Sequence, residues 1–116
     1  MNQHEKINYL ELPARDIAAT KRFFEAVFNW VFTDFGDDYV AFSNAGIGGV
    51  FYRSELTATP GEGSVLVVFY SAELDATQAK IELHGGTTVK PAYAFPGGRR
   101  FHFCDPNGNE YAVWSE

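Results

Sequence analysis

The sequence predicts an α+β fold of two pseudo-symmetric βαβββ modules, and three observations support this. The pattern of one strand, one helix and three strands occurs twice along the chain. Residues 57–63 separate the two repeats and have the composition of a linker, with Pro and Gly and no hydrophobic period. The length of 116 residues suits one compact domain. We therefore expect a single domain over residues 1–116, with module 1 at about 5–56 and module 2 at about 64–116.

Module 1 begins with alternating apolar and polar residues at 7–12, which is the pattern of a half-buried strand. Asp16 can cap the helix that follows, whose apolar residues between positions 17 and 28 fall on one face. Three strands are expected after this helix, separated by turn-forming runs that contain Gly and Asn, at residues 31–35, 39–43 and 49–53.

Module 2 begins with the apolar run 65–71, which predicts a buried strand. Asp75 followed by Gln78 has the spacing of a capping box, and the helix is expected to end at His84, before two glycines. The remaining strands are expected at residues 88–94, 99–104 and 110–114.

Composition and charge argue against several classes of partner. Nine Lys and Arg against fifteen Asp and Glu give a net charge of −6, which disfavours binding to a nucleic-acid backbone. The single cysteine, Cys104, excludes an intrachain disulfide and is expected to be a small buried hydrophobe rather than a nucleophile. No signal-peptide pattern and no apolar run of roughly 18 residues is present, so we expect a cytoplasmic protein without a membrane partner.

Four segments carry a family resemblance: Glu11-Leu12-Pro13-Ala14-Arg15-Asp16, Phe23-Phe24-x-x-Val27-Phe28-x-Trp30, Gly85-Gly86 and Asp105-Pro106-x-Gly108-Asn109. In order and spacing they resemble the vicinal oxygen chelate superfamily of glyoxalases, bleomycin-resistance proteins and dioxygenases. The resemblance implies a cup-shaped, partly closed β-sheet with one helix per module on the outside. It also implies a homodimer, in which the cup is formed by one chain or shared between two.

The resemblance also assigns four metal-ligand positions, and the residues found there do not suit a metal. These positions fall at Tyr9, at Leu66 or Val65, at Gly48 or Gly49, and at Ala112. Metals of this class need imidazole and carboxylate ligands, which apolar side chains and glycine cannot supply. We therefore expect no metal and no other cofactor, and a metal-dependent glyoxalase or dioxygenase is disfavoured.

Among the three histidines, only His102 is a candidate for function. His4 lies in a polar N-terminal tail, and His84 lies in the last helical turn, where a cation is favoured by the helix dipole. Strand alternation places His102 opposite Phe101 and Phe103, and so toward the cup if the phenylalanines pack on a helix. Two interpretations remain open: a hydrogen-bonded histidine of the core or rim, or a residue that contacts ligand or transfers a proton.

The same alternation predicts the residues that line the cup. The candidate catalytic residues are Glu11 and His102, and the candidate ligand-binding residues are Tyr9, Tyr70, Arg100, Glu110 and Trp114. A carboxylate such as Glu11 needs a partner if it points into an apolar cup, and Arg100 or a cation of a dimer mate could serve. A surface salt bridge at the mouth of the cup is the alternative for Glu11.

The sequence thus predicts a protein that binds a small aromatic or cationic molecule in a metal-free β-cup, as bleomycin-resistance proteins do. The alternative is a lyase-like or isomerase-like enzyme that acts on a small carbonyl compound, with Glu11 or His102 as general base. The sequence does not identify the ligand.

Overall fold

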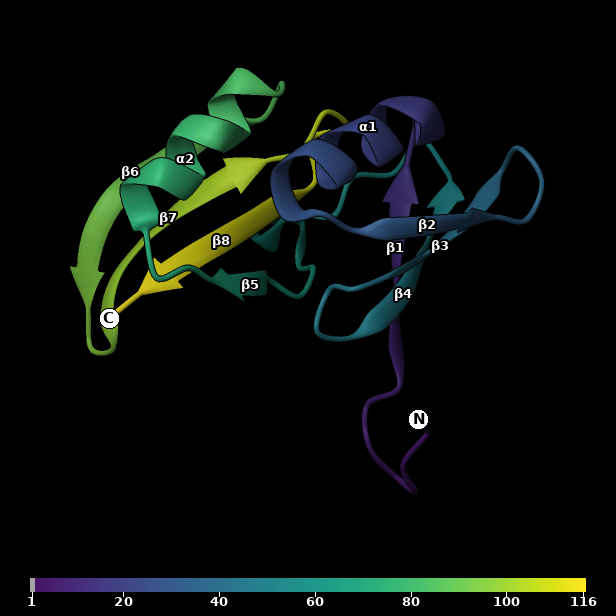
Figure 1. Cartoon of the computed structure of the whole chain (residues 1–116), viewed down its shortest axis with the longest axis horizontal. Helices are drawn as coiled ribbons and strands as arrows, with labels where there is room; N and C mark the ends of the chain where they lie inside the picture. Colours follow the sequence, from purple (N-terminus) through teal and green to yellow (C-terminus); the bar gives the residue numbers. More distant parts are fainter. Residues whose placement is uncertain (1) are drawn as a thin grey trace. The chain divides into compact units, whose positions relative to one another are not determined.

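Two βαβββ modules follow one another along the chain in the computed structural model, which describes residues 2–116 (Figure 1). They correspond to two compact units, Met1–Leu56 and Thr57–Glu116. Each module holds one α-helix and one open four-stranded sheet, and the strand orders β1-β4-β3-β2 and β5-β8-β7-β6 are equivalent. The predicted α+β class and the repeated module are therefore confirmed.

The first module contains β1 (Tyr9–Ala14), α1 (Ile17–Phe28), β2 (Val31–Asp34), β3 (Tyr39–Ser43) and β4 (Gly48–Arg53). β1 pairs with β4 in parallel, and the other pairs are antiparallel. The predicted N-cap of α1 is confirmed, because the Asp16 carboxylate accepts a hydrogen bond from the Ala19 N–H at 2.9 Å. Stacked aromatic rings fill this core, with Trp30 at 4.3 Å from both Phe24 and Phe42 between ring centroids.

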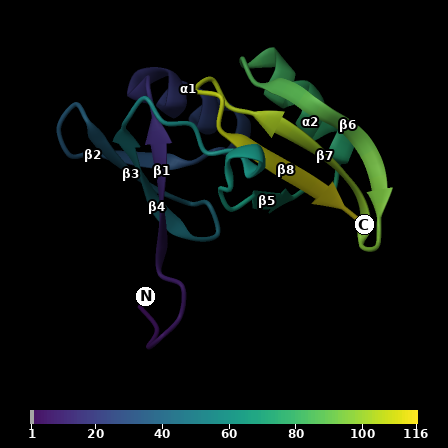
Figure 2. The same cartoon turned by 180° about the vertical axis from the view of Figure 1, so that it is seen from behind.

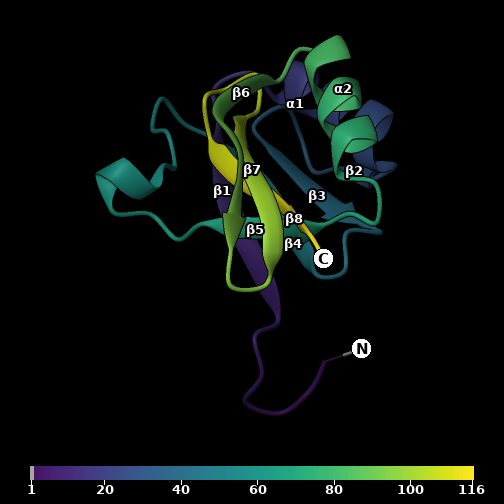
Figure 3. The ribbon, with the colours of Figure 1, turned by 90° about the vertical axis from the view of Figure 1, so that its left-hand side faces the viewer.

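The second module contains the short 3-10 helix η1 (Pro60–Glu62), β5 (Val67–Tyr70), α2 (Leu74–Leu83), β6 (Thr87–Phe95), β7 (Gly98–Cys104) and β8 (Glu110–Ser115). α2 lies on one face of the sheet, as Figure 3 shows. Its Gln78 and Glu82 side chains bond the Thr88 hydroxyl of β6. The side chains between this helix and the sheet are fully buried and mostly aromatic, and they include Ile81, Phe101, Phe103, Tyr111 and Val113.

The turn between β7 and β8 is held by the Asp105 carboxylate, which is only 4% exposed. It accepts hydrogen bonds from the Asn107 N–H at 2.8 Å, the Asn109 N–H at 3.1 Å and the Tyr111 hydroxyl at 2.7 Å. The Asn109 amide oxygen in turn accepts the Ala58 N–H at 2.8 Å, which joins the segment before η1 to the turn. Burial raises the pKa of Asp105 above its ordinary range, although the hydrogen bonds act to lower it.

Three local predictions need correction. The capping box at Asp75 is wrong, because α2 begins one residue earlier, and the Ser71 hydroxyl instead accepts the Glu73 N–H. The strand expected at residues 65–71 begins only at Val67, so Leu66 precedes the sheet. The first strand is displaced by two residues, to Tyr9–Ala14, because its pairing with β4 continues to Arg53.

β6 departs from regular pairing at two places, between Thr88 and Lys90 and between Lys90 and Tyr93. Lys90 lies opposite His102, and Tyr93 lies opposite Arg100. Three residues of β6 therefore span the length of two residues of β7. A bulge of this kind reverses the face on which the following side chains lie. Tyr93 consequently lies on the same face as Lys90, and Pro91 lies within the irregular stretch.

None of the helices within residues 2–116 is long and apolar enough to span a membrane.

Candidate functional site

Most of the predicted site residues lie together on the face of the second sheet that points away from α2, here called the His102 face. In the register of the sheet, Trp114 lies between Tyr70 and Arg100, and Ala112 lies between Val68 and His102. Figure 2 shows the four strands side by side. The phenylalanines flanking His102 are fully buried, which confirms that its ring points to the face opposite theirs.

A continuous chain of hydrogen bonds crosses this face from Arg100 to Glu110. The Arg100 Nε–H donates to the Tyr93 phenol oxygen. The same phenol lies 3.1 Å from His102 Nε2, and His102 Nδ1 lies 2.8 Å from the Glu110 carboxylate. The His102 side chain is buried, with 6% of the residue exposed, and both ring nitrogens have a partner.

The chemistry of these groups fixes the direction of each bond when the imidazole is neutral. An ionised carboxylate only accepts, so the His102 proton resides on Nδ1 and is donated to Glu110. Nε2 is then an acceptor and receives the Tyr93 O–H. Since Arg100 only donates, the Tyr93 oxygen donates to one neighbour and accepts from the other.

An open hollow of about 250 Å³ lies beside this chain of hydrogen bonds, lined by Val68, Phe95, Gly97, Arg100 and Trp114. Its walls are mainly apolar and aromatic, and the Phe95 and Trp114 rings meet edge to face at 6.2 Å between centroids. The half-buried Arg100 guanidinium is the only charged group among the lining residues.

Arg100 is held by aromatic contacts rather than by an acidic partner. Its Cζ lies 5.0 Å from the Phe95 ring centroid and 5.4 Å from that of Tyr93. Within residues 2–116, no carboxylate forms an ion pair with Arg100, and its Nη atoms donate no hydrogen bond. The nearby carboxylates are engaged elsewhere: Glu110 with His102, and Glu116 with the Tyr70 hydroxyl at 2.6 Å.

Cys104 lies opposite Glu110 on the neighbouring strand and is partly buried. Burial, together with the negative charges of Glu110 and Asp105, raises the pKa of its thiol. A thiol in this environment is less ionised than a free one at neutral pH and is a poor nucleophile.

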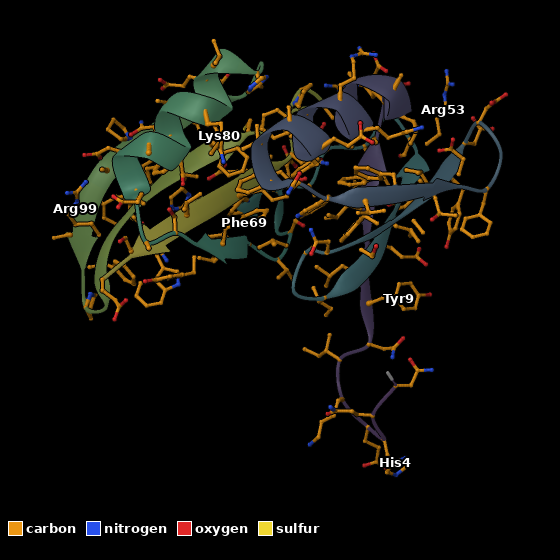
Figure 4. All side chains as sticks on the ribbon, in the orientation of Figure 1. His4, Tyr9, Arg53, Phe69, Lys80 and Arg99 are labelled. Carbon is orange, nitrogen blue, oxygen red and sulfur yellow. The ribbon has the colours of Figure 1, made fainter. Side chains whose placement is uncertain are left out.

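The other two predicted site residues, Tyr9 and Glu11, lie in the first module. Both are exposed, and the Tyr9 hydroxyl donates to the Glu11 carboxylate at 3.2 Å. Tyr9 also borders a larger hollow of about 610 Å³ between strands β3 and β4 and the N-terminal segment, in which Figure 4 labels His4. The only charged residue lining this hollow is Lys6, and its other polar lining residues include Asn2, Gln3 and Asn8.

Sequence reasoning missed Tyr93 and Phe95. Counted from Thr88, which faces α2, strict alternation already places Tyr93 on the His102 face, because the two irregularities of β6 reverse the alternation twice; what alternation did not show is that Tyr93 lies opposite Arg100 and reaches His102. Pro91 does signal the irregular pairing of β6, because proline inside a strand marks an edge or a bulge.

Comparison with known proteins identifies the family. The model of the Glyoxalase/Bleomycin resistance protein/Dioxygenase superfamily matches residues 6–113. The chain belongs to this superfamily. A search of curated proteins finds no significant match.

Solved structures of the superfamily have a similar fold at low sequence identity. A glyoxalase-related enzyme from Fulvimarina pelagi is 15% identical, with a TM-score of 0.79 over 97% of this chain and 88% of that chain. The fosfomycin resistance protein FosX from Listeria monocytogenes is 19% identical, with a TM-score of 0.78 over 96% of this chain and 90% of that chain. That structure is of the E126Q mutant complexed with Mn(II) and 1S,2S-dihydroxypropylphosphonic acid. FosX from Mesorhizobium loti is 15% identical, with a TM-score of 0.76 over 98% of this chain and 94% of that chain.

The residues at the superfamily's metal positions do not fit a metal ion. Tyr9 pairs with Gly48 and Ala112 pairs with Val68, so the ligand position predicted at Leu66 or Val65 lies before β5. A Cβ added at Gly49 would lie 2.2 Å from the Phe42 ring, so no ligand side chain fits there. Across residues 2–116, no three His, Cys, Asp or Glu side chains are grouped to hold a metal. That the purified protein is metal-free stays a prediction.

Proposed function

We propose that this protein binds a small molecule with a planar apolar part and a negatively charged group, and that the binding site is the hollow on the His102 face. The observation that carries the proposal is the half-buried Arg100 guanidinium, which lines an aromatic hollow and has no carboxylate partner within residues 2–116.

The two parts of the ligand follow from the two kinds of wall. Phe95 and Trp114 offer aromatic surface for a flat apolar group, while the Arg100 Nη atoms can form paired hydrogen bonds with a carboxylate or a similar anion. Interactions with a charged group strengthen where aromatic walls exclude water.

The charges favour an anionic ligand over the cationic one that the sequence also allowed. A cation in the hollow would be repelled by Arg100, and the nearby carboxylates of Glu110 and Glu116 already accept hydrogen bonds from His102 and Tyr70. Lys90, whose Nζ lies 4.5 Å from the Tyr93 ring centroid, adds a second positive charge near Arg100. Among similar structures, FosX from Listeria monocytogenes is complexed with a phosphonic acid, so this fold can hold a small organic acid.

The test uses the two tryptophan indole N–H signals in a proton–nitrogen correlation spectrum. Trp114 lines the hollow, whereas Trp30 is buried in the first module and serves as an internal control. Titration with phenylacetate should shift the Trp114 signal and leave that of Trp30 in place. Phenethylamine, which carries a cation on a similar aromatic frame, should leave both signals in place.

Substitutions at Arg100 make the test specific. Arg100→Gln should abolish the shift caused by phenylacetate, while Arg100→Lys should weaken it, because lysine keeps the charge but not the paired donors. Arg99→Gln is the matched control, since Arg99 points to the other side of β7 and pairs with Asp75 on the surface. A Trp114 shift that survives in Arg100→Gln, or that phenethylamine causes equally, contradicts the proposal.

A further inference from the structure

We infer that Tyr93 is a catalytic acid–base that moves a proton on a small 2-oxo acid held beside Arg100, with His102 and Glu110 as its proton relay. This inference rests on the proposed function, because it requires an anionic ligand at the hollow. It adds the reacting group, the substrate class and the reaction.

The first support is the connectivity of the hydrogen bonds. Glu110, His102 and Tyr93 are joined in series at 2.8 Å and 3.1 Å, with the carboxylate on one ring nitrogen and the phenol on the other. This is the arrangement in which a carboxylate orients an imidazole so that it can take a proton from a hydroxyl.

The second support is that each charge formed by proton transfer has an opposite charge in contact. When the Tyr93 proton moves to His102 Nε2, the imidazolium is formed against the Glu110 carboxylate. The phenolate is formed against the Arg100 Nε–H, with the Lys90 ammonium 4.5 Å from its ring centroid. Opposite charges at such distances attract, which lowers the energy of the charge-separated state.

The third support is that Arg100 joins the hollow to the relay. Its Nε is bonded to Tyr93, and the same residue lines the hollow. A carboxylate bound by the Nη atoms would therefore place the rest of a small ligand next to the Tyr93 oxygen. Such positioning is the main requirement for general acid–base catalysis.

The reaction that these groups can perform is keto–enol tautomerisation, and it needs no other reactant. The C–H bond next to the 2-oxo group breaks, and its proton goes to the Tyr93 oxygen while the tyrosine's own proton moves to His102 Nε2. The electron pair of the C–H bond forms a carbon–carbon double bond, and the carbonyl oxygen takes the negative charge. Tyr93 then donates a proton to that oxygen and recovers its own from His102, so the product is the enol.

Phenylpyruvate is a suitable probe, because it combines an aromatic ring, a carboxylate and an acidic C–H next to a carbonyl. In deuterium oxide, abstraction of that proton replaces it with deuterium, so loss of its proton NMR signal measures the step. The protein should accelerate this loss above the rate in buffer. Tyr93→Phe, which keeps the ring and removes the hydroxyl, should reduce the accelerated rate by about a hundredfold or more.

Separate readouts distinguish this inference from the proposed function. Tyr93→Phe and Glu110→Gln should lower the exchange rate while phenylpyruvate still shifts the Trp114 indole signal at the same concentrations. Tyr39→Phe, at an exposed tyrosine of the first module, is the matched control and should leave the rate unchanged. The Trp30 and Trp114 signals of each variant show whether it is folded.

Two outcomes overturn the inference and leave binding intact: phenylpyruvate shifts Trp114 without faster exchange, or Tyr93→Phe exchanges as fast as the unaltered protein. If phenylpyruvate does not shift the Trp114 signal at all, the proposed function fails as well.

Discussion

Replacing Asp105 by alanine should destabilise the second module more than any other single substitution of an acidic residue there. The carboxylate accepts hydrogen bonds from Asn107, Asn109 and Tyr111, and it is 4% exposed. Each buried donor that loses its acceptor costs about 1–3 kcal/mol. Water can enter beside the exposed Pro106 and replace part of this loss. The free energy of unfolding should therefore fall by about 2–4 kcal/mol.

The assay is urea unfolding at neutral pH, followed by tryptophan fluorescence. Asp75→Ala is the matched control: it removes a carboxylate that is 85% exposed and makes a single surface ion pair with Arg99. That variant should lose less than about 1 kcal/mol. If Asp105→Ala loses no more than Asp75→Ala, the carboxylate does not organise the turn, and our account of how the turn joins β7 and β8 is wrong.

Four further predictions concern pH, reactivity, metal content and assembly. The folded-state pKa of Asp105 is raised above 3.8, so its contribution to stability is present below that pH and declines as pH rises through the folded value. The difference in unfolding free energy between the unaltered protein and Asp105→Asn should therefore shrink with rising pH in urea titrations, and a difference that grows refutes this. Cys104 should react with a disulfide reagent at mildly alkaline pH more slowly than a free thiol, and Glu110→Gln should speed the reaction, because the Glu110 charge raises the thiol pKa. Elemental analysis after dialysis should find no stoichiometric zinc, nickel, iron or manganese, and EDTA should leave the Tm unchanged. Light scattering should give twice the chain mass of 12.9 kDa, and a clean monomer at micromolar concentration would disprove the homodimer.

The sequence by itself determined the elements and the faces of the strands. Hydrophobic period, the Asp16 cap and the glycines after α2 predicted both modules, because these signals act within one helix or strand. Alternation likewise assigned Arg100 and His102 to one face of β7, and Glu110 and Trp114 to one face of β8.

Only the tertiary structure decided which of these side chains meet. Alternation fixes the face of a side chain but not the register between strands, and it is the register that brings Glu110 to His102. The same limit applies to Tyr93, since the irregular pairing of β6 sets it opposite Arg100 and brings its hydroxyl to His102. Where a bulge lies is settled by the hydrogen bonds that β6 makes with β7 along its whole length. The group that completes the relay therefore became visible only once the strands were paired.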